Sequence, residues 1–90
     1  MPRYVVERSH PERLRPRAST AGGDPWAELI ATNAEQGVTW IHSYVVADFS
    51  KSFCICDAPT PEAVRAAARL TNLTIDRITE VRVLDPYLPS

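Results

Sequence analysis

The sequence predicts one α+β domain with four strands and two helices in the order βαββαβ. Three observations support this prediction: a central pair of apolar and aromatic runs, two helix start signals in which a capping residue precedes proline, and a strand-like run toward each end of the chain. In chain order these are the runs at 3–8, Asp24-Pro25, 38–46 and 52–56, Thr60-Pro61, and 75–84.

The central hairpin holds most of the chemically versatile side chains. Its two runs, 38–46 and 52–56, are rich in β-branched and aromatic residues, and a short polar link joins them. Successive side chains of a strand point to opposite faces. We therefore expect Trp40, His42 and Tyr44 to share one face of the first hairpin strand.

The second hairpin strand carries both cysteines of the chain. Cys54 and Cys56 are two residues apart, so they share a face opposite Phe53 and Ile55. Their Cα atoms would be roughly 6.5–7 Å apart, at the limit for a disulfide and poorly aimed for one. We expect two reduced thiols.

Both helices have recognisable starts. Asp24 and Thr60 are N-cap residues, and each is followed by proline at the first helical position, where its missing N–H is tolerated. Gly37 is the expected left-handed stop of the first helix. The apolar positions are Trp26, Leu29, Ile30 and Ala34 in the first helix and Ala63, Val64, Ala67, Ala68 and Leu70 in the second.

The element order βαββαβ is that of the ferredoxin-like fold, an antiparallel sheet with both helices on one face. Right-handed crossovers give the spatial strand order 4, 1, 3, 2. Residues 9–23 lack periodicity and are expected to form a long surface loop within the single domain 1–90. The uncovered sheet face is expected to pair with a second copy through a twofold axis, giving a homodimer.

Composition excludes several partner classes. The net charge of −1 gives no basic field for nucleic acid or anionic membranes. The chain shows no signal-peptide pattern and no long apolar run, so we expect a cytoplasmic protein without a membrane span.

Alternation along the strands suggests a polar cluster on the open sheet face. If the helices cover Val6, Ile41, Val45, Phe53 or Ile55, Val81 and Val83, the other face carries Glu7, His42, Glu80 and Cys54 or Cys56, with Trp40 and Tyr44 beside them. Neighbouring carboxylates repel unless a cation lies between them. Imidazole, carboxylate and thiolate are competent ligands for a borderline ion such as nickel or zinc.

Simpler interpretations stay open. Glu7 with Arg82, or Glu80 with Arg8, could form cross-strand ion pairs. His42 could be a hydrogen-bonded interface residue. Cysteines spaced C-x-C on a strand are a weak metal signal and are more often small buried hydrophobes. His42 with Cys54 lacks an orienting third group and an oxyanion hole, so we assign no catalytic residue. An acid–base role for Glu7 and Glu80 in a closed dimer cavity also stays open.

The chain resembles a family of small bacterial ferredoxin-like proteins that includes a nickel-binding member. The matching segments are 2–8, 37–44, Asp48, Phe53-Cys54, 57–63 and 78–81, of which the run Trp40-Ile41-His42-Ser43-Tyr44 is the most distinctive. The resemblance implies a homodimer that binds nickel. The positions that match the shared pattern and can ligate a metal are Glu7, His42, Cys54 and Glu80; Cys56 stands where an aromatic residue is expected.

Our leading hypothesis is a cytoplasmic homodimer that binds nickel, or another divalent transition metal, on the open sheet face through His42, Glu7, Glu80 and Cys54. In this hypothesis Trp40, Tyr44 and Cys56 line the pocket or the interface. The alternative is a dimeric α/β-barrel pocket that binds or converts a small hydrophobic molecule without metal. Its walls would be Trp40 and Tyr44, and its base Glu7 or His42.

Overall fold

A computed structural model describes residues 1–11 and 25–88, and these contain the six expected elements in the expected order. The elements are β1 (Arg3–Ser9), α1 (Pro25–Glu35), β2 (Thr39–Val45), β3 (Lys51–Asp57), α2 (Pro61–Thr71) and β4 (Arg77–Val81). Most of the expected surface loop, and the expected N-cap Asp24, lie outside the described residues.

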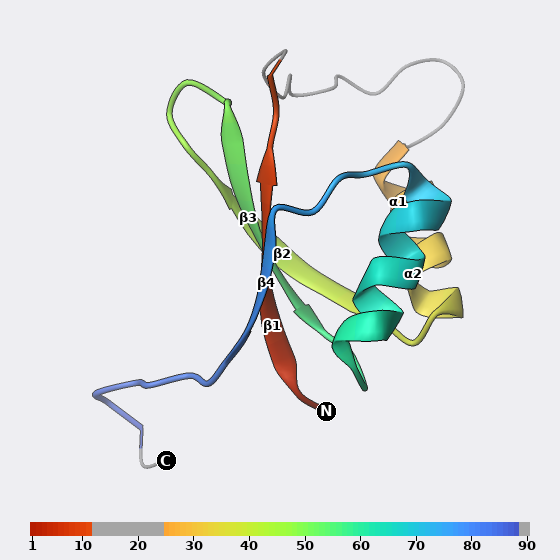
Figure 1. The fold of residues 1–90 in the computed structure, drawn as a ribbon. Coiled ribbons are helices and arrows are strands. Elements are labelled where there is room, and N and C mark those ends of the chain that lie inside the picture. The colour runs from red at the N-terminus through yellow and green to blue at the C-terminus, as the bar shows by residue number, and fades with distance from the viewer. Residues whose placement is uncertain (12–24, 89–90) are drawn as a thin grey trace.

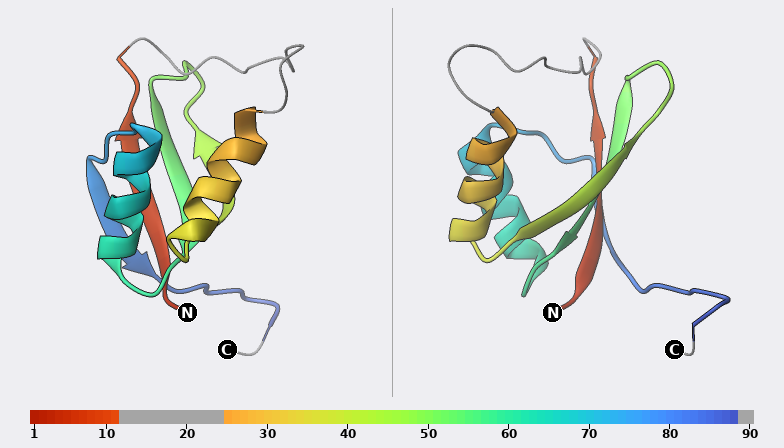
Figure 2. Two further views of the ribbon diagram at one scale, coloured as in Figure 1. Left: turned by 90° about the vertical axis from the view of Figure 1, so that its right-hand side faces the viewer. Right: turned by 180° about the vertical axis from the view of Figure 1, so that it is seen from behind.

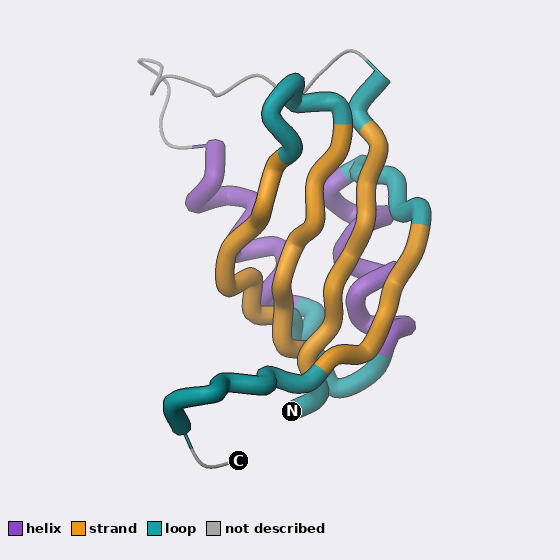
Figure 3. The backbone as a smooth tube through the Cα atoms, turned by 90° about the vertical axis from the view of Figure 1, so that its left-hand side faces the viewer, coloured by secondary structure: helices purple, strands orange, loops and turns teal. Residues whose placement is uncertain are grey.

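The four strands form one antiparallel sheet in the order β2-β3-β1-β4 (Figures 1 and 3). This is the predicted order, and it places β3 and β1 at the centre. Both helices lie on the same side of the sheet, as the two further views show (Figure 2). The ferredoxin-like α+β prediction is confirmed, and no described helix covers the other sheet face.

The ends of the helices follow the local sequence signals. The backbone N–H of Ala63 donates to Thr60 Oγ1 at 3.2 Å, which caps α2 at its first turn. Asn72 ends α2 in the left-handed conformation, with φ of 58°. Gly37 follows α1 with φ of +77°, a conformation that side chains rarely adopt, and its N–H donates to the carbonyl of Ala34.

The core lies between the sheet and the helices and is built mostly from small and medium side chains, with Tyr4 as its large aromatic member. It comprises Tyr4, Val6, Val38, Cys56, Ala58, Val64 and Ala67, with Cys54, Ala63, Ile75 and Ile78 packed against it. Val6 is 1% exposed and pairs with Cys54 of β3 and Ile78 of β4, so it lies at the middle of this layer. The even-numbered side chains of β1 and β3 therefore face the helices.

The segment after β4 leaves the sheet and runs away from the body of the molecule (Figure 1). It carries four exposed apolar side chains: Val83, Leu84, Tyr87 and Leu88. Leu84 and Tyr87 are 90% and 91% exposed, which is unusual for large apolar residues close together in sequence. In the part of the chain that the structure describes, no helix has the length and apolar character needed to span a bilayer.

Candidate functional site

A β-bulge in β2 separates the aromatic and imidazole side chains that alternation had placed together. Trp40 pairs with Cys56, but His42 pairs with Ile55, so Ile41 is an extra residue between two registered pairs. Directly paired residues share a face of the sheet. Trp40 consequently faces the helices while His42 faces the open side, and the expectation of one shared face is wrong.

The bulge and the sheet register also correct the predicted division of the other strands. Cys54 and Cys56 lie on the helix face, whereas Phe53 and Ile55 lie on the open face. Val81 pairs with Arg3 and lies on the open face as well. On the helix face, the buried Cys56 belongs to the same core cluster as Val64 and Ala67 of α2, and Cys54 packs against that cluster.

The open face carries His42 and Tyr44 on its outermost strand. Their rings are in edge-to-face contact, with centroids 5.1 Å apart and planes at 88°. Both side chains are exposed, Tyr44 by 63%. The imidazole is thus accessible from the side of the sheet that the helices leave uncovered.

Two ion pairs share this face. Glu7 accepts from Lys51 at 3.4 Å, and not from Arg82 as one simple interpretation allowed. Arg3 donates from Nε and Nη2 to the two carboxylate oxygens of Asp57, at 2.8 and 3.3 Å. The hydrogen bond from Arg3 lowers the pKa of Asp57, and the same contact raises the pKa of Arg3.

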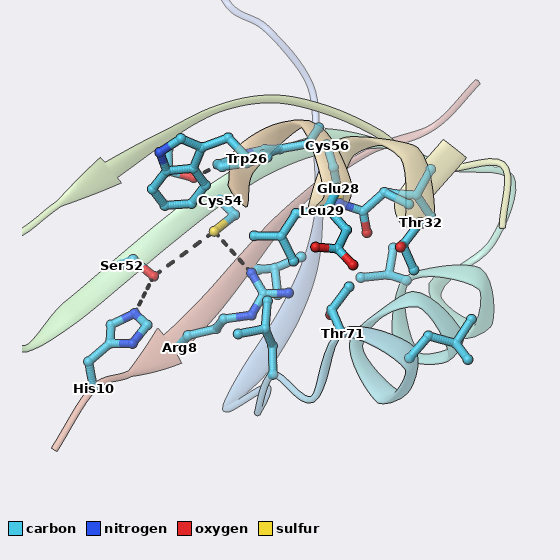
Figure 4. A pocket seen from close by; sticks show the side chains of 18 residues that line it. Arg8, His10, Trp26, Glu28, Leu29, Thr32, Ser52, Cys54, Cys56 and Thr71 are labelled. Atoms are coloured by element: carbon cyan, nitrogen blue, oxygen red, sulfur yellow. Dashed lines mark hydrogen bonds between the residues drawn. The ribbon is translucent and has the colours of Figure 1, made fainter. Parts of the chain in front are cut away.

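A cavity of about 450 Å³ lies on the other side, between the helices and the sheet (Figure 4). Its lining combines apolar walls with a short polar row. The lining residues are Val6, Arg8, His10, Trp26, Glu28, Leu29, Thr32, Asn33, Val38, Trp40, Ser43, Ser52, Cys54, Cys56, Val64, Leu70, Thr71 and Leu73. Trp26 of α1 and Trp40 of β2 are in tilted contact at the wall, with ring centroids 5.4 Å apart.

The polar row links β1 to β3 at one end of the cavity (Figure 4). Arg8 Nη1 donates to Cys54 Sγ at 3.0 Å, and Cys54 Sγ lies 4.0 Å from Ser52 Oγ. Ser52 Oγ is 2.8 Å from His10 Nε2. The Nε of Arg8 is buried and has no hydrogen-bond partner among the described residues.

Two further groups on the helix face, Cys56 and Tyr4, have raised pKa values. Burial raises the pKa of the Cys56 thiol to about 11, so this thiol stays protonated at neutral pH and is a poor metal ligand. Burial also raises the pKa of Tyr4, and the nearby charge of Glu80 adds to the rise. Glu80 pairs with Tyr4 in the sheet, which places it on the helix face at the edge strand.

The comparisons with known proteins agree with this fold. A family model described as nickel responsive protein SCO4226-like matches residues 4–81, most of the chain. The chain belongs to the SCO4226-like family. The crystal structure of SCO4226 from Streptomyces coelicolor A3(2) superposes with a TM-score of 0.62 at 14% identity, covering 92% of this chain and 99% of that one. No curated protein sequence matches the chain.

The four metal-ligating candidates of this SCO4226-like chain do not converge. Glu7 and His42 share the open face, whereas Cys54 and Glu80 lie on the helix face. Across residues 1–11 and 25–88, no three His, Cys, Asp or Glu side chains are grouped so that they could hold one ion. The expectation that all four lie on one sheet face is therefore wrong.

Sequence reasoning overlooked the cavity and the residues that make it polar. Arg8 lies two residues after Val6 in β1, and this spacing was the signal that Arg8 would lie on the helix side of the sheet. The alternative hypothesis made Trp40 and Tyr44 walls of one pocket, but they lie on opposite faces of the sheet.

Proposed function

We propose that this protein is a nickel-binding homodimer whose metal site forms between two copies at the open sheet face, with His42 as the principal ligand. The observation that carries the proposal is the position of His42: an exposed imidazole on the uncovered face, in a chain of the nickel responsive SCO4226-like family. Imidazole is a good ligand for nickel and is neutral over much of the physiological pH range.

A second copy is needed because, among the described residues of one chain, His42 and Glu7 are the two candidate ligands on this face, while Asp57 is held by Arg3. His42 and Glu7 are two strands apart and displaced along the sheet, so their Cα atoms are separated by about 12 Å. Side chains stand roughly perpendicular to a sheet, so these two do not lean toward each other. Two sheets packed face to face lie about 10 Å apart, which lets a ligand from each copy reach the same ion.

Glu7 is the second ligand in this proposal. Its present partner Lys51 is 40% exposed at the side chain, and an exposed ion pair of this kind contributes little stability. Exchange of Lys51 for a divalent cation therefore costs little. Cys54 and Glu80 are outside this site because they face the helices.

Dimer formation is supported by the apolar surface that one chain leaves open. Phe53, Ile55 and Val5 form the middle of the open face, and all three are only partly buried in the monomer. The segment after β4 adds the exposed side chains of Leu84 and Tyr87. A second copy would cover these groups, in keeping with the closed twofold symmetry of most small oligomers.

Nickel titration calorimetry on the tag-free protein tests the proposal, with the dimer measured by sedimentation in the same buffer. The chain has two histidines, so His10→Ala is the matched control for His42→Ala. In the same way, Glu80→Gln is the control for Glu7→Gln. We expect saturable binding at a fixed ratio per dimer, weakened at least about tenfold by His42→Ala and Glu7→Gln and kept in both controls. Unchanged nickel affinity in His42→Ala would refute this assignment.

A further inference from the structure

The cavity beneath the helices is separate from the open sheet face and has its own chemistry. It lies on the opposite side of the sheet from His42 and Glu7, and its polar end is made by Arg8, Cys54 and Ser52 (Figure 4). The nickel proposal uses none of these groups.

Arg8 is the decisive residue because its charge is not balanced within the described chain. A guanidinium stays protonated at all physiological pH values, so burial cannot neutralise it. Arg8 has no ion pair with any described carboxylate, and its Nη1 donates only to the thiol of Cys54, a weak acceptor. Its Nε is closed off from solvent and has no described partner. Arg3, in contrast, is paired with both oxygens of Asp57.

An anion in the cavity would supply the missing partner. Burial of a charge is costly unless it is paired and hydrogen-bonded, and a carboxylate matches the planar donor edge of a guanidinium. The row that links Cys54 to Ser52 and His10 adds hydroxyl and imidazole groups beside Arg8. These groups can donate to the same acid group or orient it.

The remaining walls define the rest of the ligand. Trp26, Trp40 and Leu29 line the cavity together with Leu70 and Leu73, so the body of the ligand would be apolar or aromatic. The cavity volume of about 450 Å³ lies within the range of small-molecule sites. A ligand of roughly a dozen non-hydrogen atoms fits this space.

The charge of the lining limits the acid group to a single negative charge. Among the described lining residues Arg8 is the one Lys or Arg, and Glu28 contributes a carboxylate from the exposed side of α1. A phosphate or polyphosphate would face Glu28 with only one guanidinium to offset it. A carboxylic acid matches this balance better.

We propose that the cavity between the helices and the sheet binds a small amphipathic carboxylic acid, with its carboxylate on Arg8 and its apolar body between Trp26 and Trp40. The site is formed by one chain and does not depend on the nickel proposal or on the dimer. This site differs in two ways from the metal-free pocket for a hydrophobic molecule that the sequence suggested. It lies on the helix side of the sheet, and its ligand requires an acid group.

The two tryptophans of the chain, Trp26 and Trp40, both line the cavity, so intrinsic fluorescence reports its occupancy directly. The probes are 4-phenylbutyrate and its neutral amide, 4-phenylbutyramide, which have nearly the same shape and differ in charge. Titrations in chelator-treated buffer, followed by fluorescence and calorimetry, compare their dissociation constants. We expect saturable one-to-one binding of the acid, at least about tenfold tighter than that of the amide, in line with a charge-assisted hydrogen bond.

Variants assign this preference to Arg8. Arg8→Met keeps an apolar stem and is expected to remove the preference for the acid, whereas Arg65→Met makes the same charge change on the exposed face of α2 and is expected to keep it. Thermal melting monitors folding, and the acid–amide comparison on the unaltered protein tests the proposal even if Arg8→Met does not fold. Equal binding of acid and amide, no binding of either at millimolar concentration, or an equal loss in Arg65→Met overturns the proposal.

Discussion

Replacing Val6 by Ala tests the assignment of the helix-covered face. Val6 is 1% exposed, at the centre of the core. The substitution removes two buried methyl groups, which corresponds to about 1.6 kcal/mol of transfer free energy. A cavity of roughly 40 Å³ adds about 1 kcal/mol. The expected loss in the free energy of unfolding is therefore about 2.5 kcal/mol, which lowers the Tm by about 10–20 °C in a domain of this size.

Val5→Ala is the matched control, because it makes the same chemical change one residue away on the other face. Val5 is only partly buried in one chain and pairs with Ile55 and Thr79 on the open side. Urea unfolding at low protein concentration, where a dimer would dissociate, should give a clearly smaller loss for Val5→Ala than for Val6→Ala. Equal losses, or a loss below about 1 kcal/mol for Val6→Ala, would contradict the assignment of faces.

Three further predictions concern the cap at Thr60, the ion pair of Asp57 and the burial of Cys56. Thr60→Ala removes the side-chain cap on the N–H of Ala63, so urea unfolding should show a loss of about 1 kcal/mol, and no loss would contradict the capping role. The pKa of Asp57 is lowered by Arg3, so its stabilising effect is present above the ordinary carboxyl pKa and is lost as the pH falls through the lowered value. Asp57→Asn should therefore destabilise the protein at pH 7 and weaken the acid dependence of its Tm, and an unchanged pH profile would contradict this. Burial raises the pKa of the Cys56 thiol to about 11, so at pH 8 this thiol should resist a thiol reagent until the protein is unfolded. Labelling is followed in a Cys54→Ser variant, and rapid labelling of the native protein would refute this prediction.

Much of the fold could be predicted because its signals are local. Thr60 before Pro61 started a helix, and Gly37 adopted the positive φ that makes it an effective stop. Strand order then followed from the handedness of the crossovers, which depends on chain chirality and not on particular side chains.

The division of the sheet into two faces could not be predicted from alternation alone. The bulge at Ile41 is centred on a β-branched residue, whereas glycine is the residue that commonly marks such a site in a sequence. In β3 the larger pair, Phe53 and Ile55, lies on the open side while the cysteines lie under the helices. Hydrophobic size favours the opposite arrangement, but the register with β1 pairs Cys54 with Val6 and Cys56 with Tyr4, and so places both cysteines on the helix side.

The bulge at Ile41 and the register of β3 also explain why the predicted metal ligands do not lie together. The predicted set of His42, Glu7, Glu80 and Cys54 depended on unbroken alternation along the strands, so the bulge and the register divide it between two faces. The cavity is lined by residues of β1, β3 and α1, which are far apart in sequence. The one sequence signal for it is the spacing of Arg8, two residues after Val6 in the same strand.

Residue-resolved NMR during a nickel titration tests the central claim most directly, because it locates the ion on one face of the sheet. We predict that the amide signals of His42, Tyr44 and Glu7 change first and saturate together, while those of Leu70 and Leu73, which line the cavity beneath the helices, stay unchanged. Changes centred on His10 and the cavity beneath the helices, with His42 unaffected, would contradict the claim that nickel binds at the open face.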